Sequence, residues 1–255
     1  MINSNISALM YHGVHNSAQC EGNYDGVYSV SCTTFCQHLN WLQQSNYQAV
    51  TLEQALTQKI QNPVIITFDD GDVSNYLVAF PELVKRGMLA EFYITTDWIN
   101  TQGYMSEQQL KEMHNAGMSI QSHSKSHPYL SDINSAELYN ELMISKNRLD
   151  EITNDNVHTI ALPGGRGLDQ VLPLYKKLGY KTIATSILRK NTSTHQLNRI
   201  TVTSGFNLEL LSSLVTRSGA IYYKAIIKQF VFNLAKKILG NHYYEVVRSK
   251  LLRES

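Results

Sequence analysis

The chain is 255 residues long, with 43% hydrophobic residues, 17% charged residues and a net charge of +1. This length and apolar content suit a single soluble enzyme domain with a buried core, and the near-neutral charge argues against a nucleic-acid partner. The three cysteines, Cys20, Cys32 and Cys36, make no CxxC pair, which argues against a disulfide framework and against a cysteine zinc site.

Strands and helices are predicted to alternate along the chain. Residues 63–68 form a short continuous apolar run, which is typical of a parallel strand buried on both faces. Ser106 and Gln109 have capping-box spacing and predict a helix that Gly117 ends. The other predicted elements, in chain order, are a helix over 77–84, strands over 89–95 and 118–122, a helix over 136–152, a strand over 157–162, a helix over 169–178, and strands over 180–185 and 199–202.

This alternation predicts an α/β fold built from parallel βαβ units. The candidate site residues fall at or just after the carboxyl ends of predicted strands, which is where barrels of this class hold catalytic groups. The pattern by itself also permits an open doubly wound sheet.

Two adjacent carboxylates, Asp69 and Asp70, end the apolar run and are followed by Gly71. Adjacent residues of an extended chain point in opposite directions, so the two carboxylates serve one site only if the strand breaks, and Gly71 provides that break. One carboxylate then faces a metal, while the other faces the water that the metal activates.

Two histidines, His123 and His127, follow the predicted strand over 118–122. In a helical turn, positions i and i+4 lie one above the other, so we expect both imidazoles to reach one ion. Two histidines and one carboxylate leave positions open for water and substrate, as in catalytic zinc sites. The alternative is a pair of surface histidines on a helix.

The segment TFDDG (67–71), together with HSKSHP (123–128), resembles the first two motifs of the polysaccharide deacetylase family, also called the NodB homology or carbohydrate esterase 4 family. The resemblance covers residues 7–202 and implies a distorted, incomplete (β/α) barrel of about seven parallel strands. It implies that Asp69 is the general base and that Asp70, His123 and His127 bind one divalent metal. Nitrogen and oxygen ligands suit Zn²⁺, and Co²⁺ or Ni²⁺ would also fit.

The third motif of the family is commonly RxP[FY]G, and here the chain departs from it. Ala161 stands where the arginine is usual, and Arg166, five residues later, is the candidate replacement that orients the base. In the family, a backbone amide just after the proline holds the oxyanion, and Gly164 matches that position. The alternative for this segment is an ordinary glycine-rich turn between a strand and a helix.

A general acid is expected near the start of the chain. Residues 11–14, YHGV, look like the YHxV opening of the branch that deacetylates poly-N-acetylglucosamine, and no LxH motif is evident near the end of the barrel region. By that match, His12 protonates the leaving amine, a role suited to a side chain with a pKa near neutrality. The alternatives are a core histidine bonded to the backbone, and His195 as the acid.

The resemblance implies a metal-dependent hydrolase that removes an N-acetyl group from an amino sugar in an oligosaccharide, a lipid-linked glycan or another glycan precursor. A second hypothesis keeps the site but makes the protein an O-acetyl esterase or a deformylase. A third is a catalytically idle glycan-binding member, which the altered third motif keeps open.

Residues 221–255 differ from the catalytic domain expected over 1–220. They hold seven basic and two acidic residues, a net charge of +5, and an apolar stripe at helical spacing. We expect a C-terminal helical extension that packs its stripe on the barrel, with a peripheral membrane or partner surface as the alternative. No apolar stretch reaches membrane-spanning length and no signal peptide is evident, which predicts a cytoplasmic protein, with the inner face of the membrane as a further location.

Overall fold

The computed structural model describes residues 6–16 and 21–229 of the chain. The chain divides into two compact units, Met1–Gly205 and Phe206–Ser255. The domain boundary expected after residue 220 therefore falls inside the second unit, within a helical stretch over 219–229.

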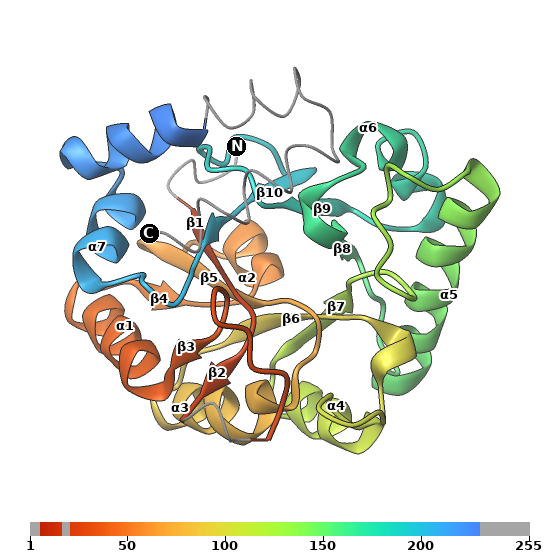
Figure 1. Ribbon diagram of the computed structural model, residues 1–255, viewed down its shortest axis with the longest axis horizontal. Coiled ribbons are helices and arrows are strands. Elements are labelled where there is room, and N and C mark those ends of the chain that lie inside the picture. The colour runs from red at the N-terminus through yellow and green to blue at the C-terminus, as the bar shows by residue number, and fades with distance from the viewer. Residues whose placement is uncertain (1–5, 17–20, 230–255) are drawn as a thin grey trace. The chain divides into compact units, whose positions relative to one another are not determined.

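The first unit is built on one parallel sheet (Figure 1). Eight strands follow one another in the order β10-β9-β8-β7-β6-β5-β1-β11, and β4 pairs with β5 beside this path. The strands are β1 (Ser7–Tyr11), β4 (Gln48–Ala49), β5 (Pro63–Phe68), β6 (Ala90–Ile94), β7 (Ser119–Ser122), β8 (Thr159–Ala161), β9 (Thr182–Thr185), β10 (Gln196–Asn198) and β11 (Ile200–Thr201). The short strands β2 (Val14–His15) and β3 (Val30–Ser31) form a separate pair.

One short stretch of chain brings the two edges of this sheet together. β10 lies at one edge beside β9, β11 lies at the other edge beside β1, and Arg199 alone separates β10 from β11 in the sequence. The side-chain amide of Asn191 also joins β10 to the start of β1, because it donates hydrogen bonds to the main-chain oxygens of Ile6 (3.2 Å) and Asn198 (3.1 Å). The predicted distorted (β/α) barrel is therefore confirmed, and the sheet is not an open doubly wound one.

Helices surround the strands of this unit (Figure 1). The capping box predicted for Ser106 and Gln109 is present: each side chain accepts a hydrogen bond from the other residue's main-chain N–H. Two helices that we did not predict, α1 and α2, precede β5. The helical segments of the unit are α1 (Cys32–Gln44), α2 (Leu52–Thr57), η1 (Asn75–Ala79), α3 (Phe80–Lys85), η2 (Thr96–Trp98), α4 (Glu107–Asn115), α5 (Ser135–Thr153), η3 (Pro163–Gly165), α6 (Leu168–Val171) and η4 (Tyr175–Leu178).

The two faces of the sheet pack separate groups of buried side chains. On the outer face, Phe68 and Phe92 stack with their ring centroids 4.8 Å apart. A second buried cluster includes residues from five strands of the sheet, namely Ala8, Ile65, Tyr93, Ala161 and Ala184. Because side chains alternate along a strand, residues 65, 67 and 69 share this inner face, so Asp69 faces the barrel interior at the carboxyl end of β5.

The second unit begins with α7 (Leu208–Thr216). The side-chain oxygen of Asn207 accepts a hydrogen bond from the main-chain N–H of Leu210 (2.9 Å), and Arg217 ends the helix in a left-handed conformation. A further helical stretch covers 219–229, and the basic tail beyond it lies outside the described residues. Within the described ranges, no helix is both long and apolar enough to cross a bilayer.

Candidate active site

The loop after β5 turns sharply at Asp70. Asp70 has a φ of 77° and Gly71 a φ of 90°, so both residues are left-handed and the extended chain ends at Asp69. Asp69 is 2% exposed, and its main-chain N–H donates a hydrogen bond to the oxygen of Tyr11 (3.0 Å). The break expected at Gly71 is present and starts one residue earlier.

The two histidines lie in a loop rather than in the helical turn that we predicted. Ser124 (φ 67°) and His127 (φ 64°) are left-handed, which no helix accommodates. The loop is held by Glu141 on α5, whose Oε2 accepts hydrogen bonds from the main-chain N–H groups of Lys125 (2.9 Å) and Ser126 (2.8 Å). This conformation still brings the His123 and His127 rings together, with centroids 4.9 Å apart.

Asp70, His123 and His127 converge on one point. Oδ1 of Asp70 lies 3.3 Å from Nε2 of His123 and 3.4 Å from Nε2 of His127, and one ligand atom from each residue lies within 4.8 Å of the others. Nδ1 of His123 lies 3.1 Å from the main-chain oxygen of Ala161. Because a carbonyl only accepts, Nδ1 carries the proton and Nε2 presents its lone pair, which is the usual arrangement of a metal-binding histidine.

This triad meets the requirements of a metal site. Among the described residues, Oδ1 of Asp70 is buried without a hydrogen-bond partner, which is costly unless a cation neutralises it. Burial, with the charge of neighbouring His123, lowers the pKa of His127 to about 4, so its imidazole is in the neutral form that binds metals. Burial alone would lower the pKa of His123 too, but the negative charges of Asp69 and Asp70 outweigh burial and raise this pKa. Two imidazoles and one carboxylate are donors that Zn²⁺ accepts.

Asp69 is paired with Arg199. Nη1 of Arg199 donates to Oδ1 of Asp69 (2.6 Å) and Nη2 donates to Oδ2 (2.8 Å), and Arg199 is 1% exposed. Burial would raise the pKa of the Asp69 carboxyl, but the charge of Arg199 and then that of His123 outweigh it, so the pKa of Asp69 is lowered. Asp69 therefore stays ionised beside the triad, with its Oδ2 4.0 Å from Nε2 of His123.

The position that we expected Arg166 to fill is thus filled by Arg199. The guanidinium of Arg166 lies over the ring of Tyr129, with its Cζ 4.1 Å from the ring centroid. The sequence prediction placed Arg199 at the start of the last strand but gave it no role. Its one signal was an arginine in an otherwise apolar strand segment, where a buried charge requires a partner.

Gly164 lies close to the ring of Tyr129. Its φ is 57°, and a Cβ added there would lie 2.5 Å from Cε1 of Tyr129. Arg166 stacks on the same ring, so Tyr129 lies against both candidate residues of the segment that differs from the third family motif. The glycine is therefore required twice, by its left-handed backbone and by the close approach of the ring.

The two candidate acids lie at opposite ends of the barrel. His12 follows β1, which pairs with β5 in parallel, so His12 is at the same end as Asp69. Its Nδ1 is buried and has no hydrogen-bond partner in residues 6–16 and 21–229, and its ring centroid lies 4.8 Å from that of Tyr28. His195 is exposed near the amino end of β9, with its Nδ1 3.4 Å from the main-chain oxygen of Lys181. Parallel strands put that end of the sheet away from Asp69.

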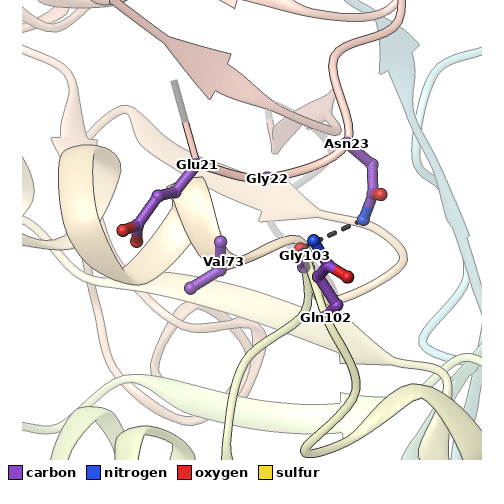
Figure 2. Close-up of a pocket in the computed structure, with 6 residues that line it drawn as sticks. All are labelled: Glu21, Gly22, Asn23, Val73, Gln102 and Gly103. Atoms are coloured by element: carbon purple, nitrogen blue, oxygen red, sulfur yellow. Dashed lines mark hydrogen bonds between the residues drawn. The ribbon is translucent and has the colours of Figure 1, made fainter. Parts of the chain in front are cut away.

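A pocket of about 620 Å³ adjoins the loop that carries the two aspartates (Figure 2). The amide of Asn23 donates a hydrogen bond to the main-chain oxygen of Gly103 (3.0 Å), which connects two walls of the pocket. Aromatic rings lie nearby, because Trp98 contacts both Tyr104 and His127, with centroid distances of 4.7 and 5.2 Å. The pocket is lined by Glu21, Gly22, Asn23, Val73, Gln102 and Gly103.

Comparisons with known proteins point to one family. The family model described as polysaccharide deacetylase matches residues 57–183, the span that holds both aspartates and both histidines. The protein YxkH of Bacillus subtilis, whose name places it among polysaccharide deacetylases, is 28% identical over 211 residues, which cover 79% of this chain and 73% of YxkH. A poly-beta-1,6-N-acetyl-D-glucosamine N-deacetylase of Staphylococcus aureus is 27% identical over 197 residues, which cover 69% of this chain and 68% of that protein.

A solved structure gives the same result for the fold. The Streptococcus pyogenes deacetylase PplD, in complex with acetate, matches with a TM-score of 0.73 and 28% identity over 82% of this chain and 97% of PplD. With this fold, the two motifs and the convergent triad, the chain belongs to the polysaccharide deacetylase family.

Proposed function

We propose that this protein is a metal-dependent hydrolase that removes the N-acetyl group from an amino sugar in a glycan or glycan precursor. The observation that carries the proposal is the convergence of Asp70, His123 and His127 beside an ionised Asp69, with the Oδ1 of Asp70 buried and lacking a hydrogen-bond partner in the described part of the chain. These are the parts of a hydrolytic site that pairs a metal with a separate carboxylate base.

Asp70, His123 and His127 would hold one divalent metal, for which Zn²⁺ is the first choice on donor chemistry. When bound, such an ion supplies Lewis-acid polarisation of an acyl carbonyl and of water. Asp69 would accept the proton of the attacking water, because Arg199 keeps its carboxylate charged and fixed in direction. The main-chain N–H of Gly164 would donate to the oxyanion that develops on the acyl oxygen.

His12 would protonate the departing amine. It lies at the end of the barrel that carries Asp69, and its Nδ1 has no partner within the described part of the chain. Other groups have larger effects on the pKa values of Asp69 and Asp70, but the charge of His12 also lowers both. This supports a position of His12 close to the triad. His195, exposed near the amino ends of the strands, has no such support.

The relatives and the pocket both support this substrate class. The Staphylococcus aureus relative is named for a β-1,6-linked N-acetylglucosamine polymer, and we extend the N-acetylated amino sugar to this chain. The pocket beside the site offers amide and main-chain groups of the kind that bind sugar hydroxyls. An oligosaccharide or a lipid-linked glycan would place a neighbouring sugar there.

The direct test is mass spectrometry of products formed by the full-length, Zn²⁺-loaded protein. The panel includes N-acetylglucosamine oligomers of increasing length, an O-acetylated sugar and an N-formylated sugar. We expect loss of one acetyl group from the N-acetylated oligomers. Release of acyl groups only from the O-acetylated or N-formylated sugar would contradict the proposal, as would release from none of them.

A further inference from the structure

Glu91, on β6, is a buried carboxylate inside the barrel for which the proposed chemistry has no role. Its side chain is 0% exposed. Its Oε1 accepts a hydrogen bond from the main-chain N–H of Leu52 (2.9 Å), and its Oε2 accepts one from the hydroxyl of Tyr93 (2.7 Å). Both donors are uncharged, so neither neutralises the carboxylate, and an ion in this position is costly.

The nearby cation is that of Arg199. Its Cζ lies 5.0 Å from the centroid of the Tyr93 ring, within the range of a cation–π contact, and Tyr93 is fully buried. Burial would lower the pKa of Arg199, but Asp69 foremost, with Tyr93 and Glu91 also contributing, raises it. These residues form a series of contacts inside the barrel, which we call the stack. Glu91 accepts the hydrogen bond of Tyr93, the Tyr93 ring contacts the guanidinium of Arg199, and Arg199 donates to Asp69.

Hydrogen bonds hold the edges of the Arg199 guanidinium. Nη1 and Nη2 donate to Asp69, Nη1 also donates to Oγ1 of Thr67 (3.1 Å), and Nε donates to the main-chain oxygen of Thr185 (3.1 Å). These hydrogen bonds lie along the edges of the group, and the Tyr93 ring adds a contact of a different kind, because the Cζ of Arg199 lies over that ring. The hydrogen bond from the Tyr93 hydroxyl to Glu91 holds the ring in place.

We propose that Glu91 and Tyr93 are positioning residues, which hold the guanidinium of Arg199 so that both of its terminal nitrogens stay on Asp69. A phenol that donates to a carboxylate gains electron density in its ring, which strengthens the attraction of the ring for a cation. The inference rests on the proposed function in one respect, that Asp69 is the catalytic base.

The first arm of the test measures steady-state kinetics of the full-length, metal-loaded protein. The variants are Tyr93→Phe and Glu91→Gln, and the matched control is Tyr180→Phe, a buried tyrosine whose hydroxyl bonds to the oxygen of Leu142 (2.8 Å) away from this stack. We expect kcat to fall roughly tenfold in both stack variants with KM unchanged, and to stay within about twofold of wild type in the control.

The second arm does not depend on activity. In a ¹⁵N–¹H spectrum, the Nε–H of Arg199 gives a cross-peak that is absent in Arg199→Lys and that exchanges slowly because the group is buried. We expect this cross-peak to shift, or to exchange faster, in Tyr93→Phe and Glu91→Gln but not in Tyr180→Phe. If the wild type deacetylates nothing, the proposed function fails while this arm still tests the positioning of Arg199.

Three outcomes would overturn the inference. An unchanged Arg199 cross-peak in Tyr93→Phe, equal changes in all three variants, or a Tyr93→Phe enzyme with the kcat of the control would each show that the stack only stabilises the barrel. Tyr93→Phe removes a single oxygen, so it carries the test if Glu91→Gln does not fold.

Discussion

Arg199 and Asp69 lie 130 positions apart in the chain, yet they form a two-bond guanidinium–carboxylate pair with distances of 2.6 and 2.8 Å. Arg199 is the residue between β10 and β11, so the point where the barrel edges meet is also the point that fixes the carboxylate. Folding of the barrel and assembly of the site are therefore coupled through one side chain.

The Arg199–Asp69 pair gives the first prediction. Arg199→Lys keeps the charge but cannot make the two-bond contact, so we expect kcat to fall by about tenfold or more. Arg199→Ala leaves a buried carboxylate unpaired and should lower the free energy of unfolding by about 3–5 kcal/mol. Arg166→Lys is the control, and a kcat loss in Arg166→Lys as large as that in Arg199→Lys would contradict the assignment.

The second prediction concerns metal binding. Asp70→Ala, His123→Ala and His127→Ala should each lower the metal content of the purified protein, because a three-ligand site has no spare donor. Elemental analysis measures this directly, with the exposed His195→Ala as the control. We also expect a chelator to abolish turnover and added Zn²⁺ to restore it. Wild-type metal content in all three variants would place the metal elsewhere.

The third prediction separates the base from the metal ligands. Asp69→Asn keeps the shape of the side chain but cannot accept a proton, so kcat should fall by roughly 10²–10⁴ while metal content stays at the wild-type level. Parallel measurements of kcat and bound metal decide this. Near-normal turnover in Asp69→Asn would mean that another group takes the proton.

The fourth prediction concerns the general acid. His12→Ala should lower kcat by roughly 100-fold, because the amine then leaves without a proton donor. The same substitution at His195 should leave kcat unchanged, since His195 lies near the amino ends of the strands. A large loss in His195→Ala with a small one in His12→Ala would reverse the assignment.

The fifth prediction tests the contact between Gly164 and Tyr129. Gly164→Ala adds a Cβ at a left-handed position, which costs about 1–2 kcal/mol, and the Cβ meets the Tyr129 ring. We expect lower stability in thermal unfolding and a lower kcat. The double variant Gly164→Ala with Tyr129→Ala should recover the part that is due to the ring. Gly26→Ala is the control, because a Cβ there would meet nothing within 4 Å.

The sequence by itself determined those features of this protein that depend on a few neighbouring residues. The motifs at 67–71 and 123–128, and the apolar run at 63–68, are each contiguous, so the class of site and the main strands could be predicted from them. The capping box at Ser106 and Gln109 is local too, and the helix begins there as expected. Family resemblance added the barrel, which the alternation of strands and helices left undecided between two architectures.

The tertiary structure decided what depends on distant segments. Spacing alone suggested a helical turn for His123 and His127. The structure instead has a loop whose main-chain N–H groups donate to Glu141 on α5, and in which Ser124 and His127 are left-handed. Arg166, the arginine nearest in sequence to the expected motif position at Ala161, stacks on Tyr129. Arg199 reaches Asp69 instead, because β10 and β11 bring it to the barrel interior. Sequence separation does not determine these contacts, since the register of parallel strands sets which distant residues meet.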